Sequence, residues 1–322
     1  MKLAIQLALL GLGLFTASRA GVAAEAAPAG SHSAAGTLSE GVVWPDSTNA
    51  VRFRLYTNAS PDAPHLFNTF EIEGFGERLL PAPTGDSLKR LFAASPASAS
   101  LHSILVNGSG PELAATNSLT LIEQKAGPEW RYVAFDGSAA YRGRLASYRR
   151  GLLFVEPDLF VLHDHLVANE PAQFQMVLHA WTNTVLDPIW RDLRLELPHA
   201  GLRVAAPSRH VLRVWERAES PVDSLLPGTV TMQLGPTNKL AQLDLLTVFA
   251  VYRGGEKKDY VFKLVESNNA VGARVHRGGL PTLLAFKTDP AVARASVTGF
   301  GFDGPVGVSV FRPGPKVTEI RR

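Results

Sequence analysis

The sequence predicts an all-β protein, a large antiparallel two-sheet β-sandwich with few short helices. Short stretches that alternate apolar and polar residues recur along almost the whole chain, whereas helix signals are scarce. Many of these stretches are separated by Gly, Pro, Asn or Asp, which are the residues that turns favour. Together, the two observations are typical of an antiparallel sandwich.

Residues 1–24 have the pattern of a cleavable signal peptide. Lys2 supplies the positive start, an apolar stretch follows, and small residues lead to a cleavage position after Ala24, with Ala20 as an alternative. No later apolar stretch reaches the ~18 residues that a membrane span needs, so we expect no membrane span in the mature protein. The pattern predicts a periplasmic or extracellular location.

Composition excludes several classes of function. The formal net charge is +3, and removal of Lys2 and Arg19 with the leader, which holds no acidic residue, lowers it to +1. Without a dense basic patch, this balance argues against a nucleic-acid partner. The chain has Cys 0, so it offers neither disulfides nor thiolate chemistry. Phosphate-loop and dinucleotide-binding motifs are also absent.

The remainder of the chain is predicted to form one domain. Residues 25–38, "EAAPAGSHSAAGTL", are small and polar and indicate a flexible linker. Residues 39–322 contain no repeat of fixed period and no strong internal boundary, so we expect a single β-sandwich domain.

The strands are predicted in chain order from their alternating patterns. The stretches are 50–58, 66–80, 103–106, 118–125, 130–137, 152–168, 173–181, 193–197, 212–218, 229–235, 243–254, 259–266, 293–302 and 306–312. Asn107-Gly108 predicts a tight turn, and Pro157-Asp158 predicts the turn of the clearest hairpin. Residues 86–95 predict a short helix.

Two histidines, His163 and His165, stand two positions apart on one predicted strand and therefore share a face. With a third ligand from a neighbouring strand, for which His179 is the nearest candidate, they could chelate a metal. A hydrogen-bonded pair on a sheet face explains them equally, so no metal site is assigned. Asp164 lies on the opposite, apolar face, where a carboxylate needs a partner, and an arginine is the simplest one.

The stretch "AYRGRLASYRR" (140–150) concentrates arginine and tyrosine. Arginine pairs with carboxylates and tyrosine rings stack on sugars, so the stretch is a candidate site for acidic sugars. A solvated strand edge has the same composition. Five tryptophans could include a sugar platform, although most tryptophans in a sandwich belong to its core; they are Trp44, Trp130, Trp181, Trp190 and Trp215.

Three motifs in order resemble the C-terminal β-sandwich of the heparinase II/III-like polysaccharide lyases. These are "NTFEIEGFGERLL", "LHSILVNGSGP" and "YRRGLLFVEPDLFVLHDHL", and the resemblance spans residues 42–182 in detail. The residues that match the family pattern are Asn68-Thr69-Phe70, Gly76-Glu77, His102-Ser103-Ile104, Val106-Asn107-Gly108, Arg149 or Arg150, Pro157-Asp158 and Asp164.

The resemblance implies an enzyme that breaks acidic polysaccharides by β-elimination. Such lyases place an α/α toroid against the sandwich and bind the glycan between them. A group of the enzyme neutralises the uronate, a base takes the C5 proton, and an acid protonates the leaving oxygen. The resemblance also implies a structural zinc in the sandwich.

This chain departs from the family pattern. Too few residues separate the leader from the first strand-like stretch for a toroid, which leaves two alternatives: a separate chain supplies the toroid, or the toroid has been lost. The family's H-x-H falls on Asp62 and Pro64, with His65 one place out of register, and no acid follows the Gly-Glu strand. Of the zinc ligands only His102 keeps its position. No cofactor is therefore assigned, and zinc is left with an incomplete ligand set.

Two functions remain open from the sequence. The first is an exported lyase-type protein acting on uronic-acid-containing polysaccharide, with His102 and Tyr141 as acid/base candidates and Arg144, Arg149 and Arg150 binding the substrate carboxylate. The second is a non-catalytic sandwich that binds acidic glycan or a partner protein.

Overall fold

The structure is a computed structural model that describes residues 42–45, 50–57, 67–82, 101–112, 118–187, 192–217, 226–256, 259–277 and 280–311. The chain divides into two units, Met1–Gly36 and Thr37–Arg322, and all described residues belong to the second. The expected signal peptide, the linker over 25–38 and the helix over 86–95 all lie outside the described ranges. They stay predictions, as do the domain boundaries.

An eight-stranded antiparallel sheet, here called the central sheet, has two buried faces. Its order is β11 (Val185–Asp187), β12 (Asp192–Glu196), β13 (Ala200–Ala205), β16 (Leu240–Arg253), β9 (Leu159–Ala172), β8 (Leu145–Val155), β7 (Trp130–Asp136) and β6 (Thr120–Gly127). Leu152 and Phe154 belong to one apolar core, while Leu153 and Val155 belong to another. Since successive residues of a strand face opposite sides, the uninterrupted apolar stretch of β8 reflects burial on both faces.

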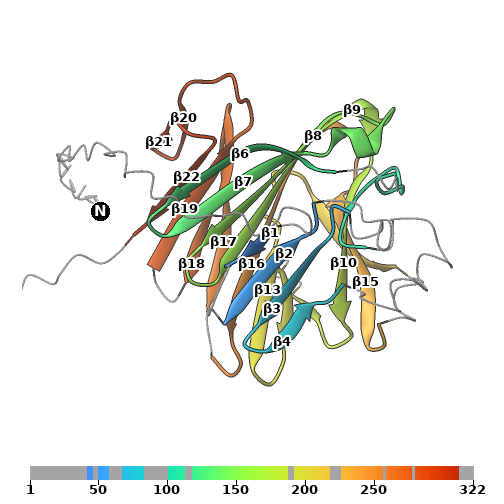
Figure 1. The fold of residues 1–322 in the computed structure, drawn as a ribbon, viewed down its shortest axis with the longest axis vertical. Coiled ribbons are helices and arrows are strands. Elements are labelled where there is room, and N and C mark those ends of the chain that lie inside the picture. The colour runs from blue at the N-terminus through green and yellow to red at the C-terminus, as the bar shows by residue number, and fades with distance from the viewer. Residues whose placement is uncertain are drawn as a thin grey trace, which may run out of the picture. The chain divides into compact units, whose positions relative to one another are not determined.

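Two four-stranded sheets contribute to the core on the inner face of the central sheet. Their orders are β1 (Val42–Trp44), β2 (Val51–Leu55), β3 (Phe70–Gly74), β4 (Glu77–Leu80), and β14 (Leu212–Arg217), β15 (Thr229–Pro236), β10 (Phe174–Trp181), β5 (Ile104–Val106). Figure 1 shows β2, β3 and β4 side by side in blue to teal. Phe53 of β2 stacks on Phe70 of β3 with ring centroids 5.2 Å apart, and Phe249 of the central sheet contacts both rings.

A further sheet packs on the outer face of the central sheet. Its strands are β17 (Tyr260–Ser267), β18 (Ala270–Arg277), β19 (Leu280–Lys287) and β22 (Val306–Val310), of which β18, β19 and β22 are orange to red in Figure 1. Phe286 of β19 and Val275 of β18 share a core with Val161 and Val248 of the central sheet. A two-stranded hairpin, β20 (Ala295–Val297) and β21 (Phe300–Phe302), adds a small third core.

The predicted all-β antiparallel sandwich is confirmed, and the outer sheet adds a layer to the two sheets expected. Glu156 to Asp158 join β8 to β9, as the Pro157-Asp158 turn predicts. Asn107 and Gly108 both have positive φ, 52° and 79°, which a type I′ turn requires. Within the described residues, the helical element is the short turn η3 (Ser138–Tyr141), and no helix could cross a membrane.

The outer layer can be tested by removing one ring. Phe286 is 1% exposed and lies 4.8 Å from the His163 ring, centroid to centroid. Phe286→Ala leaves a cavity between the two sheets and is expected to lower the free energy of unfolding by about 3–5 kcal/mol in urea titrations. Phe311→Ala is the control, because Phe311 is 51% exposed and its loss should cost within about 0.5 kcal/mol. Equal effects would show that the outer sheet does not depend on this core.

Candidate functional site

Three of the residues that carry the family resemblance, Asn68, Arg150 and Asp164, meet in a buried polar cluster on the inner face. Arg150 of β8 stands directly opposite Asp164 of β9. Its Nε donates to Asp164 Oδ1 at 2.6 Å and its Nη2 to Oδ2 at 3.1 Å, and both side chains are 0% exposed. The expectation that an arginine satisfies the carboxylate on the apolar face is confirmed.

Asn68 and Tyr148 complete this cluster. Arg150 Nη1 donates to the main-chain oxygen of Asn68 at 2.8 Å and to its Oδ1 at 2.9 Å. Tyr148 donates its hydroxyl proton to Asp164 Oδ1 at 2.9 Å and accepts a hydrogen bond from Asn68 Nδ2 at 3.1 Å. Burial would lower the pKa of Arg150, but the Asp164 charge outweighs it and raises the pKa, so the guanidinium stays charged. No face of the Arg150 guanidinium is open to a substrate.

Tyr141, the predicted acid, lies beside this cluster and is also 0% exposed. Its hydroxyl donates to the main-chain oxygen of Ile104 at 2.8 Å, and its ring meets that of Tyr148 edge-on at 5.3 Å. Burial raises the pKa of Tyr141, which keeps the hydroxyl protonated. The proton thus stays on the Tyr141 hydroxyl inside the sandwich, donated to a backbone carbonyl.

His102 is buried two residues before β5, at the position where the family pattern has a metal ligand. Its Nε2 lies 3.1 Å from the main-chain oxygen of Pro81, and its ring contacts Phe70 at 4.9 Å and His179 at 5.1 Å. Burial, followed by the proximity of His179, lowers the pKa of His102 well below its ordinary value. His102 is therefore a neutral core imidazole at physiological pH.

Among the described residues, the donor set does not fit the zinc that the family resemblance implies. A structural zinc takes four ligands in a tetrahedron, and His102 has one imidazole, His179, as a neighbour. Across the described ranges, no three His, Cys, Asp or Glu residues are placed to hold a metal. Asp62, Pro64 and His65 lie outside those ranges.

The candidate metal ligands His163, His165 and His179 are not brought together. His163 contacts Phe286 of the outer sheet, whereas His179 contacts His102 in the inner layer, so the central sheet separates them. The reason is the alternation along β9, which turns His163 and His165 away from the Asp164 side.

The three predicted substrate arginines also face different surroundings. Arg150 is in the inner core, while Arg149, on the opposite face of β8, pairs with Glu123 and donates to the Tyr132 hydroxyl at 3.3 Å. Arg144 is half-buried and donates to the main-chain oxygens of Ser109 and Gly110, at 2.8 Å and 2.7 Å. They do not form a single carboxylate-binding site.

The tryptophans provide no exposed ring in the part of the chain that the structure describes. Trp44 is buried in the inner core, and Trp130 and Trp181 are half-buried. Trp181 also donates from Nε1 to the main-chain oxygen of Arg78 at 2.7 Å. Trp190 and the Trp215 side chain lie outside the described part.

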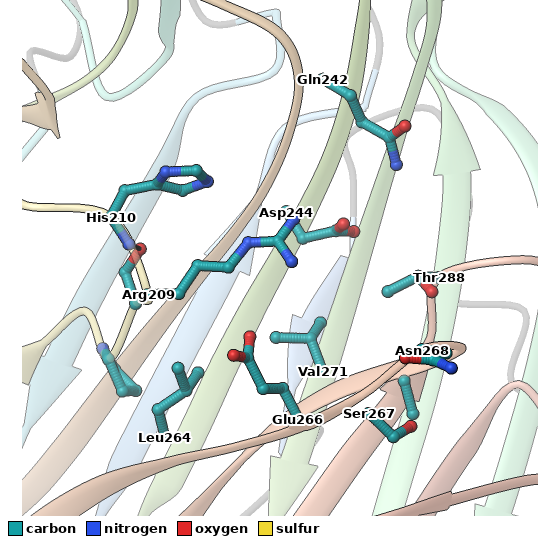
Figure 2. A pocket seen from close by; sticks show the side chains of 13 residues that line it. Arg209, His210, Gln242, Asp244, Leu264, Glu266, Ser267, Asn268, Val271 and Thr288 are labelled. Atoms are coloured by element: carbon teal, nitrogen blue, oxygen red, sulfur yellow. Dashed lines mark hydrogen bonds between the residues drawn. The ribbon is translucent and has the colours of Figure 1, made fainter. Parts of the chain in front are cut away.

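A second polar group lies on the outer face, where His163 and His165 share a partner, Asp244, that the sequence did not predict. Asp244 of β16 stands opposite His165 in the register, and its Oδ1 lies 2.8 Å from His165 Nδ1 and 3.0 Å from His163 Nε2. Burial would raise the pKa of Asp244, but the hydrogen bonds from His163 and His165 outweigh it and lower the pKa. Asp244 also lines a cavity of about 110 Å³ (Figure 2).

Comparison with known proteins shows which fold this is. The heparan sulfate lyase HepC from Pedobacter heparinus, as a mutant, matches with a TM-score of 0.58 and 11% identity, over 76% of this chain and 40% of that one. Heparinase III matches with a TM-score of 0.54 and 14% identity, over 74% and 39%. The chain thus has a heparinase-like β-sandwich and spans about 40% of the length of these lyases. No family sequence model matches it, and no curated protein does.

The buried ion pair can be tested by a double-mutant cycle. Arg150→Met or Asp164→Leu leaves an uncompensated buried charge, so each is expected to lower the free energy of unfolding by about 3–5 kcal/mol. The double variant should cost clearly less than the sum, as measured by urea unfolding. The exposed pair Arg294 and Asp303 is the control, where the coupling should be within about 1 kcal/mol. Additive losses at Arg150 and Asp164 would contradict the described geometry.

The neutral state of His102 predicts a pH dependence. Because the folded-state pKa is lowered, the unfolded chain binds one more proton below the ordinary pKa of 6.5. The contribution of His102 to the free energy of unfolding should therefore be complete above pH 6.5. Below that pH it should fall by about 1.4 kcal/mol per pH unit. His102→Gln should remove this part of the slope, whereas the exposed His199→Gln should not. An unchanged slope in His102→Gln would show that His102 is protonated in the folded state.

Proposed function

We propose that this chain is an exported heparinase II/III-like protein of the polysaccharide-lyase type. In this proposal the sandwich contacts uronic-acid-containing polysaccharide, and a separate α/α toroid chain completes the site for β-elimination. The observation that carries it is the fold match, which extends over 76% of this chain but only 40% of a heparan sulfate lyase. The leader pattern of residues 1–24 supports export to the periplasm or the exterior.

The burial of the acid/base candidates supports the proposal that the sandwich binds the glycan and that a toroid supplies the catalytic groups. A general acid or base has to come within hydrogen-bond reach of the proton that it transfers. His102 and Tyr141 are both 0% exposed, and the Tyr141 hydroxyl is directed at Ile104. The sandwich by itself therefore offers these groups no contact with a polysaccharide, which favours a binding role for the isolated chain.

Arg144 is the part of the arginine-tyrosine stretch that best suits contact with an acidic glycan. Its guanidinium lies over the Tyr141 ring, 5.3 Å from the centroid, and the neighbouring Arg142 is exposed. A guanidinium fixed over an aromatic ring is preorganised for a carboxylate or sulfate. We propose these two arginines as the contact for the acidic glycan.

The proposal is tested with the purified full chain and a panel of heparan, alginate, chondroitin and pectic polysaccharides. Affinity electrophoresis should show retention of the chain by at least one acidic glycan and no retention by dextran. Ultraviolet absorbance of the unsaturated uronate should stay flat, with or without EDTA. Arg142→Gln with Arg144→Gln should weaken retention several-fold, because each removes one charge-assisted contact. Arg294→Gln, on an exposed arginine elsewhere, is the control.

Two results would contradict the proposal. Rising absorbance from the chain alone, abolished in Tyr141→Phe, would make the sandwich itself catalytic. Absence of retention by every acidic glycan would remove the binding role and leave packing against a partner protein.

A further inference from the structure

The cavity beside Asp244 lies where four segments meet. These are the loop between β13 and β14, the outer face of β16, the hairpin of β17 and β18, and Thr288 just after β19 (Figure 2). Its volume is about 110 Å³. A water occupies ~30 Å³ in the liquid, so the cavity accommodates about four water-sized groups. That is enough for one edge of a sugar ring with its hydroxyl groups.

Asp244 gives the cavity a fixed hydrogen-bond acceptor. His163 and His165 both approach Oδ1, and among the described residues no hydrogen bond engages Oδ2. The side chain is 12% exposed, so the carboxylate is largely desolvated yet reaches the cavity. An ionised acceptor that two neighbours already orient binds a hydroxyl donor without further ordering of the side chain.

The remaining lining carries short polar groups around a small apolar patch. Amides and hydroxyls come from Gln242, Asn268, Ser267 and Thr288, while Leu264, Ala270 and Val271 supply apolar surface. A sugar ring needs both kinds of contact, because its hydroxyl groups donate and accept while its C–H faces are apolar.

The charge of the lining indicates which sugars fit. Two carboxylates, Asp244 and Glu266, face the cavity together with one guanidinium, that of Arg209. His210 adds no charge at neutral pH, because burial and the nearby Arg209 lower the pKa of its imidazole. The excess of negative charge disfavours a uronate or a sulfated sugar.

We propose that this cavity is a binding site for one non-acidic, hydroxyl-rich sugar unit, with Asp244 as its main hydrogen-bond acceptor. The site is separate from the arginine contact of the proposed function and does not depend on it. Loss of sugar binding here would leave retention of acidic glycans unchanged, and the reverse also holds.

The test is saturation-transfer NMR and calorimetric titration of the full chain with glucose, galactose, mannose, glucosamine and glucuronate. At least one of the first four is expected to bind, and glucuronate is expected to bind at least several-fold more weakly. Asp244→Asn should weaken sugar binding on the order of tenfold or more, because a hydrogen bond to a charged group is lost. Glu266→Gln should weaken it by a smaller factor, and since Glu266 is exposed, its effect on the free energy of unfolding should be small.

Glu170→Gln is the matched control, since Glu170 is exposed on β9 but does not line the cavity. It should leave sugar binding unchanged. The proposal is overturned if none of the sugars binds, if glucuronate binds as well as the others, or if neither Asp244→Asn nor Glu266→Gln alters binding. If Asp244→Asn fails to fold, Glu266→Gln alone decides, with unchanged binding counting against the site.

Discussion

The buried ion pair between Arg150 and Asp164 is the interaction on which the arrangement of the inner layer depends. A charge pair at 0% exposure is tolerated only when its remaining polar atoms are also bonded. Asn68 and Tyr148 supply these hydrogen bonds. Asn68 lies two residues before β3. Its φ of 59° is a conformation that asparagine adopts more readily than most residues. The pair therefore fixes β3 against β8 and β9, beyond what apolar contacts specify.

The same pair decides which residues are available for chemistry. Because the side-chain period of a strand is two, placing Arg150 and Asp164 inward forces Arg149, His163 and His165 outward. A shift of register by one residue would exchange the two sets and bury the histidines in place of the ion pair. Arg150 and Asp164, which match the lyase motifs, thus belong to the core. The polar group of Asp244, His163 and His165 lies on the outer face, beside the cavity.

Local patterns in the sequence were enough to predict the strands around this pair, but not the whole assembly. Alternation and the Pro157-Asp158 turn predicted the hairpin, and the need to satisfy Asp164 predicted an arginine partner. Strands β18 and β19 were not predicted, because glycine and arginine interrupt the apolar pattern of β18 and proline interrupts that of β19. Without these two strands, the outer layer was not predicted either. Asp244 was missed although the reasoning applied to Asp164 fits it equally: it is a carboxylate in an apolar strand, and its partners lie on a different strand.

The two proposed contacts lie toward the same end of the central sheet. The main-chain N–H of Asn169 donates to the main-chain oxygen of Arg144, and Asn169 is four residues beyond His165 on β9. At about 3.4 Å per residue, these positions on β9 are separated by on the order of 15 Å. In the two proposals, the arginine contact takes a uronate and the Asp244 cavity takes a non-acidic unit. Arg144 lies on the side of the inner layer, over the Tyr141 ring, whereas Asp244 and its cavity lie on the outer face, so the central sheet separates the two proposed contacts and each would bind its own sugar unit.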